Sequence, residues 1–96
     1  MPKKIKLTYL KKSTKFLLKN KTVLTEFMVD DLIVKFVKKR FYNIETNIDV
    51  KQMQGKPDNI YRIRKGNIRI LIKVLDNEII VEIIVFDIGF RGDVYK

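Results

Sequence analysis

The chain has 96 residues, enough for one modest hydrophobic core, so we expect a single domain spanning residues 1–96. Its 46% hydrophobic and 10% aromatic content is typical of a folded protein rather than a disordered one. The 21 Lys and Arg against 11 Asp and Glu give a formal charge of +10, which attracts phosphate polymers, anionic membranes or an acidic protein partner. The absence of Cys and His excludes disulfides, thiolate or imidazole metal sites and a histidine general base, and we expect no cofactor.

The positive charge is concentrated at the N-terminus, where eight lysines precede the first carboxylate, Glu26. This segment lacks the apolar core of a signal peptide, and no apolar run is long enough to span a bilayer. Binding to a membrane surface is also disfavoured, because the lysines have no accompanying apolar face that remains free after core packing. We therefore expect a soluble protein of the cytoplasm.

The N-terminal part of the chain predicts a strand followed by two helices. Residues Lys4–Tyr9 alternate apolar and polar side chains, as a strand does. The spacing of apolar residues predicts a first helix over Leu10–Asn20, ending at Asn20. Its expected buried stripe consists of Leu10, Thr14, Leu17 and Leu18.

A second helix is predicted from about Thr22 to Phe41, with Thr22 as the capping residue and Glu26 in the favourable first turns. The cations near its end suit the negative end of the helix dipole, so a solvated helix end explains them. The expected buried stripe of this helix is Leu24, Phe27, Met28, Leu32, Ile33, Phe36, Val37 and Phe41.

The C-terminal half predicts a sheet. A loop over Asn43–Asp49 precedes a short strand or extended segment over Val50–Gln54. Three β-branched runs follow, at Ile60–Lys65, Ile68–Leu75 and Glu78–Asp87. They are separated by Gly66-Asn67 and Asp76-Asn77, residue pairs that tolerate the positive φ of two-residue hairpin turns.

These turns predict the register of the sheet. The first places Arg64 opposite Arg69, and the second places Ile72 opposite Val81. The apolar face, which we expect against the two helices, consists of Tyr61, Ile63, Ile68, Ile70, Ile72, Val74, Ile79, Val81, Ile83 and Val85. The opposite face consists of Arg62, Arg64, Arg69, Leu71, Lys73, Ile80, Glu82 and Ile84.

Facing arginines destabilise a sheet, and planar guanidiniums bind phosphate with two parallel hydrogen bonds. We therefore interpret this second face as a cradle for a polyanion. The alternative is a solvated sheet face with Glu82 as a partial counter-ion.

Several short motifs follow one another along the chain: Gly55-Lys56-Pro57-Asp58, Tyr61-Arg62-Ile63-Arg64, Gly66, Ile68-Arg69-Ile70 and Gly89…Arg91…Asp93-Val94-Tyr95. In order, spacing and length the chain resembles the RelE/ParE superfamily of bacterial type II toxin–antitoxin systems, and most closely its RelE-like branch. The resemblance covers essentially the whole chain. It implies an α+β fold in which an N-terminal strand and a two-helix hairpin pack on an antiparallel sheet of three to four strands, in the order β-α-α-β-β-β.

The resemblance also implies an activity, that of a ribosome-dependent endoribonuclease (an mRNA interferase). Such a toxin cuts mRNA in the ribosomal A site without a metal, by attack of a 2′-OH on its own phosphate. Arg62 and Arg64 match the family's basic pair, Arg69 its phosphate-binding arginine, and Tyr95 a tyrosine at the scissile region. Arg91 lies close to a family arginine that contacts the transition state or leaving group.

One departure concerns the proton chemistry, because RelE has lysines where this chain has Arg62 and Arg64. A guanidinium is a poor proton acceptor, so these two residues suit phosphate binding and the general base stays unassigned. Tyr95, Lys65 and a ribosomal RNA group are the alternatives.

The implied partners are the ribosome, mRNA and a cognate antitoxin that is acidic and encoded next to the toxin. Two other functions stay open. One is ParE-like inhibition of DNA gyrase without nuclease activity, although the pair Arg91…Tyr95 favours the ribonuclease. The other is nucleic-acid binding by an inactive homologue.

Overall fold

The structure is a computed structural model, and it describes residues 4–53, 59–77 and 79–90. A strand and two helices come first: β1 (Lys4–Tyr9), α1 (Lys11–Lys19) and α2 (Glu26–Phe41). Four strands follow: β2 (Asp49–Gln52), β3 (Ile60–Lys65), β4 (Ile68–Asp76) and β5 (Ile80–Phe90). The predicted α+β class is confirmed, and the order of elements is the predicted β-α-α-β-β-β with one further strand. The motif at residues 55–58 lies outside the described residues.

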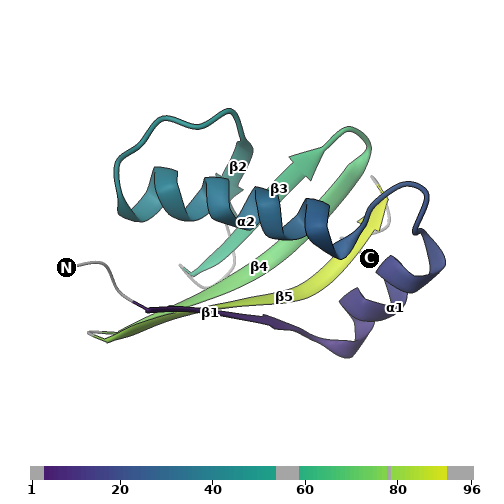
Figure 1. Ribbon diagram of the computed structural model, residues 1–96, viewed down its shortest axis with the longest axis horizontal. Coiled ribbons are helices and arrows are strands. Elements are labelled where there is room, and N and C mark those ends of the chain that lie inside the picture. Colours follow the sequence, from purple (N-terminus) through teal and green to yellow (C-terminus); the bar gives the residue numbers. More distant parts are fainter. Residues whose placement is uncertain (1–3, 54–58, 78, 91–96) are drawn as a thin grey trace.

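The sheet has five strands in the order β1-β5-β4-β3-β2 (Figure 1). The meander β2 to β5 is antiparallel, and β1 adds to it in parallel beside β5. The sheet exceeds the expected three to four strands because both the N-terminal strand and the short β2 join the meander.

The hairpin of β3 and β4 has the predicted register, in which Arg64 pairs with Arg69 and Arg62 with Leu71. Gly66 in the turn adopts a φ of 58°, a conformation that other L-residues adopt at a cost. The two-residue turn at Gly66-Asn67 therefore sets which side chains face one another across these strands.

The predicted turn at Asp76-Asn77 is wrong. The backbone N–H of Asn77 donates to the Ile80 carbonyl (3.1 Å), and its side-chain oxygen accepts hydrogen bonds from the backbone N–H groups of Ile79 (2.9 Å) and Ile80 (2.7 Å), so the chain reverses after Asn77 rather than at Asp76-Asn77. Pairing then begins at Asp76 with Val81, and Ile79 is 74% exposed rather than buried. The register is displaced by four residues, an even number, so each strand residue near the turn keeps its predicted face.

A β-bulge interrupts the pairing of β4 with β5, because Ile72 pairs with Val85 whereas Leu71 pairs with Asp87. Phe86 is the extra residue. Residues three apart on a regular strand face opposite sides of the sheet. Because the extra residue of the bulge shifts this alternation by one, both Val85 and Ile88 face the core. Strand β5 consequently extends to Phe90, beyond the predicted end at Asp87.

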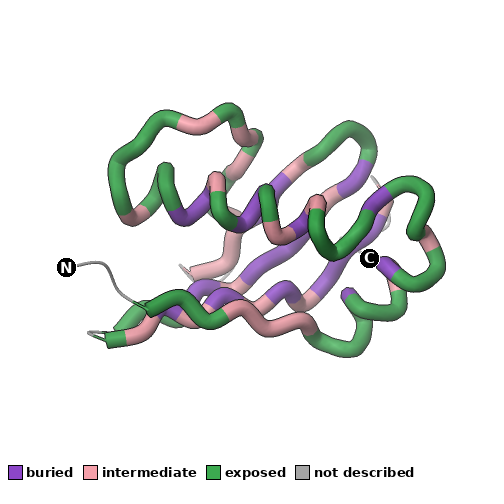
Figure 2. The backbone as a smooth tube through the Cα atoms, in the orientation of Figure 1, coloured by how far each residue is buried: buried purple, intermediate pink, exposed green. Residues whose placement is uncertain are grey.

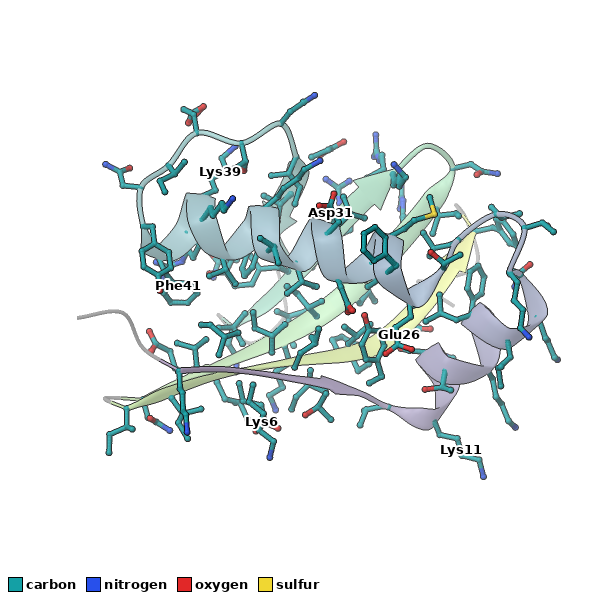
Figure 3. All side chains as sticks on the ribbon, in the orientation of Figure 1. Lys6, Lys11, Glu26, Asp31, Lys39 and Phe41 are labelled. Carbon is teal, nitrogen blue, oxygen red and sulfur yellow. The ribbon has the colours of Figure 1, made fainter. Side chains whose placement is uncertain are left out.

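Helix α2 covers one face of the sheet and forms the core with it (Figures 1 and 2). Its buried residues are Val29, Leu32, Ile33, Phe36 and Val37. The opposite side of the helix carries Asp31 and Lys39, which point away from the sheet (Figure 3). No helix in the described part of the chain is long and apolar enough to cross a membrane.

Both predicted helices differ in detail from those observed. Helix α2 begins four residues after Thr22, because the Thr25 side chain accepts the capping hydrogen bond from Met28 N–H (3.2 Å). Phe27, expected in the core, is 80% exposed.

Helix α1 packs beside β5, where β1 has ended, and stops at Asn20 as predicted. It buries Ser13 and Leu17, while Leu10, Thr14 and Leu18 are exposed. The apolar pattern did not predict the burial of Ser13, because its hydroxyl donates a hydrogen bond to a carbonyl distant in sequence, that of Val85 (2.9 Å).

The end of β1 is fixed to α2 by a hydrogen bond from the Tyr9 hydroxyl to the Asp30 carboxylate, 2.5 Å long. Partial burial and this bond raise the pKa of Tyr9 well above its ordinary value, with further contributions from the charges of Asp30 and Glu26.

The turn of the β3–β4 hairpin gives a first prediction. Gly66→Ala should lower the free energy of unfolding by about 1 kcal/mol, because alanine adopts a positive φ at this cost. No atom lies within 4 Å of the added methyl group, so the effect is conformational. The control is Asn67→Ala in the same turn, with an effect within about 0.5 kcal/mol. Urea denaturation measures both, and equal effects would contradict this account of the turn.

The Tyr9–Asp30 contact gives a prediction of pH dependence. Because the pKa of Tyr9 is higher in the folded state, its contribution is complete below the unfolded-state pKa of about 10 and declines as the pH rises further. The urea midpoint of the wild type should thus fall more steeply above about pH 10 than that of Tyr9→Phe. Parallel pH profiles would show that Tyr9 is not the responsible group.

Candidate nucleic-acid interface

The sheet face opposite α2 carries the arginines, and we call it the arginine face. It comprises Asp49 and Lys51 of β2, Arg62 and Arg64 of β3, Arg69 and Leu71 of β4, and Asp87 of β5. The strand pairing arranges them in two rows. One row runs Asp49–Arg64–Arg69, and the other runs Lys51–Arg62–Leu71–Asp87.

The first row brings two guanidiniums together, since Arg64 and Arg69 are direct partners across β3 and β4, as predicted. The side chain of Arg64 is 35% exposed, and Arg69 is also partly accessible. Two adjacent planar cations that solvent reaches can bind the oxygens of one phosphate group from two directions.

Arg62 lies on the same face but is only 8% exposed. Its Nη2 atom contacts Asp49 Oδ1 at 3.1 Å, while its Nε atom is buried without a hydrogen-bond partner. A charge this deep must be paired to be tolerated. Arg62 therefore supports the arginine face from within, and Arg64 and Arg69 form its accessible part.

Asp49 is a residue of the arginine face that the sequence did not reveal. Its second oxygen, Oδ2, lies 3.8 Å from Arg64 Nε, so one carboxylate faces two arginines while its own side chain stays 51% exposed. The sequence placed Asp49 at the end of a loop, whereas it is the first residue of β2. Its spacing of two from Lys51 was the available signal that both side chains share a face.

The other carboxylates near this face have different partners. Glu82 accepts a hydrogen bond from Thr8 (3.0 Å) and lies 3.9 Å from Lys6, both on β1. It is therefore not the counter-ion of the arginines that the alternative interpretation required. Asp87 is 8% exposed and binds Lys12 of α1 at 3.3 Å, which fixes α1 to the sheet.

Arg91 and Tyr95 both lie outside the described residues. Lys65, an alternative for the general base, is exposed at the end of β3 and pairs with Ile68. Its side chain therefore belongs to the α2 side of the sheet, away from the face of Arg64 and Arg69.

Comparison with known proteins identifies the fold. No protein-family model matches the chain, and no curated protein matches it significantly. Among solved structures, a chain of the RelB–RelE antitoxin–toxin complex from Methanococcus jannaschii has a TM-score of 0.53 and 22% identity, covering 92% of this chain and 94% of the other. A chain of the archaeal RelE–RelB complex from Pyrococcus horikoshii OT3 has a TM-score of 0.54 and 20% identity, covering 98% and 100%. The protein has a RelE-like fold.

The different burial of two arginines on β3 gives a prediction for stability. Arg62→Ala should lower the free energy of unfolding by about 2 kcal/mol, because it removes a buried aliphatic stem and the charge that holds Asp49. Arg64→Ala, on the same strand and face, should cost less than about 1 kcal/mol because its side chain is more exposed. Urea denaturation of the two variants measures the difference. An equal loss would mean that Arg62 is not a structural support.

Proposed function

We propose that the protein is the toxin of a toxin–antitoxin pair and acts as an mRNA interferase, cutting mRNA in the A site of the ribosome. The observation that carries this proposal is the pair Arg64–Arg69 on the accessible face of a RelE-like sheet. Retaining two facing arginines costs stability. A phosphate ligand repays this cost by bridging both charges.

The chemistry proposed for this surface is transfer of a phosphoryl group within the RNA strand. The 2′-oxygen attacks the adjacent phosphorus, and the bond to the 5′-oxygen of the next nucleotide breaks. Catalysis then requires alignment of the strand and stabilisation of the negative charge that builds on the phosphate oxygens. Arg64 and Arg69 fulfil the second requirement, since an arginine keeps its positive charge throughout the reaction.

Two lysines outside the arginine face suit contacts with a large RNA assembly rather than with a short isolated strand. Lys6 of β1 and Lys11 of α1 point away from the core on the outer side of these elements (Figure 3). A formal charge of +10 gives a strong, sequence-independent attraction to RNA phosphates that decreases with salt concentration. We assign these lysines to contacts with ribosomal RNA.

The proposed protein partner is an acidic antitoxin. Both structural relatives are complexes of RelE with RelB. An acidic segment would be attracted by the net charge and would compete with RNA for the same surface.

The decisive experiment is induced expression followed by mapping of transcript 5′ ends. Wild-type protein should arrest translation and produce new ends within codons positioned in the A site. Arg69→Ala should reduce cleavage on programmed ribosomes by about 100-fold or more, the usual effect of removing one stabiliser of the transition-state charge.

The matched control for that variant is Lys39→Ala, which removes one positive charge from the outer side of α2 (Figure 3). It should retain cleavage within about threefold, since a solvated charge contributes little. Intact mRNA during growth arrest would contradict the proposal. A DNA-damage response with translation unaffected would instead indicate inhibition of gyrase.

A further inference from the structure

Asp49 stands out among the carboxylates of the sheet because it is accessible and yet held in place. It is the residue of the described chain that combines a half-exposed carboxylate with contacts to two arginines of the arginine face. Glu82 and Asp87 are engaged with lysines elsewhere on the sheet. A carboxylate with these properties has a defined position from which to act on a ligand.

Buried Arg62 determines that position. Its Nη2 atom holds Oδ1 of Asp49 at 3.1 Å, and its own side chain is 10% exposed, so the surrounding protein limits its movement. The second oxygen, Oδ2, lies on the Arg64 side at 3.8 Å. One oxygen of the carboxylate therefore anchors it, and the other is directed along the row toward the proposed phosphate site.

The row places one carboxylate beside two arginines, an arrangement that suits a ribonucleotide, whose 2′-hydroxyl lies next to its phosphate. Neighbouring strands lie about 4.8 Å apart, so Asp49, Arg64 and Arg69 span about 10 Å in a line. When Arg64 and Arg69 hold the phosphate of an RNA strand, the 2′-oxygen of the preceding ribose lies within a few ångströms of that phosphate. With the strand oriented toward β2, this oxygen reaches the carboxylate of Asp49.

We propose that Asp49 accepts the proton of the attacking 2′-OH, an inference that rests on the mRNA cleavage proposed above. The chain contains no histidine, and Arg64 and Arg69 keep their protons. As the 2′-oxygen binds phosphorus, its proton moves to Oδ2 of Asp49. The P–O5′ bond breaks, and the departing 5′-oxygen takes a proton from water. The resulting hydroxide removes the proton from Asp49, which restores the carboxylate.

The test is single-turnover cleavage of mRNA on programmed ribosomes by the wild type and Asp49→Asn. The amide oxygen can still accept the hydrogen bond from Arg62, but the variant also removes the negative charge paired with this buried guanidinium, so some loss of stability is expected beside the loss of the base. Cleavage at neutral pH should decrease by about 100-fold or more. Urea denaturation of the free protein verifies that both forms are folded.

The pH profile distinguishes a proton acceptor from a residue that only positions the arginines. The charged groups that face Asp49 are Arg62 and Arg64 of β3, with Lys51 on its own strand. A carboxylate that takes the proton replaces hydroxide as the base, so the wild-type rate should be flat between about pH 6 and pH 8. The Asp49→Asn rate should rise about tenfold per pH unit, because hydroxide must then remove the proton.

A second variant protects the test against a folding defect. Asp49→Glu keeps the carboxylate and should retain a flat profile at a reduced rate. Asp31→Asn, a matched change on the outer side of α2, should leave cleavage unaltered (Figure 3).

If the cleavage rate of Asp49→Asn were lowered equally at every pH, or were unchanged, Asp49 would not be the proton acceptor, and the proposed function would still stand. Absence of cleavage by the wild type would overturn the proposed function and this inference together.

Discussion

The register of one hairpin is the constraint on which the arginine face depends. Gly66 reverses the chain with a positive φ in a two-residue turn, so Arg64 and Arg69 must lie directly opposite each other. A connection longer or shorter by one residue would send one of the two arginines into the core. The conformation of one glycine thus determines how the two arginines are placed, each of which lies 2 residues from the turn on its own strand.

The repulsion between the paired arginines is relieved by a strand that comes from elsewhere in the chain. Strand β2 adds to the edge of β3 and places Asp49 next to Arg64 in the row. The Asp49 carboxylate then lies between two cations of the neighbouring strand, Arg62 and Arg64. The hydrogen bond from the Thr46 hydroxyl to the Lys35 carbonyl (2.9 Å) joins the loop that precedes β2 to the C-terminal half of α2.

Most of the fold follows from patterns that the sequence displays. Alternating apolar residues define β1, β3 and β4, and the regular spacing over Leu32, Ile33 and Phe36 defines the buried side of α2. The resemblance to RelE-like toxins agrees with the fold that the structural comparisons identify. These features were predictable because neighbouring residues and a single buried face decide them.

What the sequence by itself determined is the hairpin pairing of Arg64 with Arg69, since a turn of two residues leaves no other register. What only the tertiary structure decided is which charges meet across greater distances. The hydrogen bonds of Asn77 moved the second turn along the chain, the bulge at Phe86 changed the face of Ile88, and the addition of β2 placed Asp49 beside Arg62. Each of these features depends on hydrogen bonds or packing between elements, so the order of charged residues along the chain does not predict it. The burial of Arg62, and therefore its separation from the accessible arginines, arises in the same way.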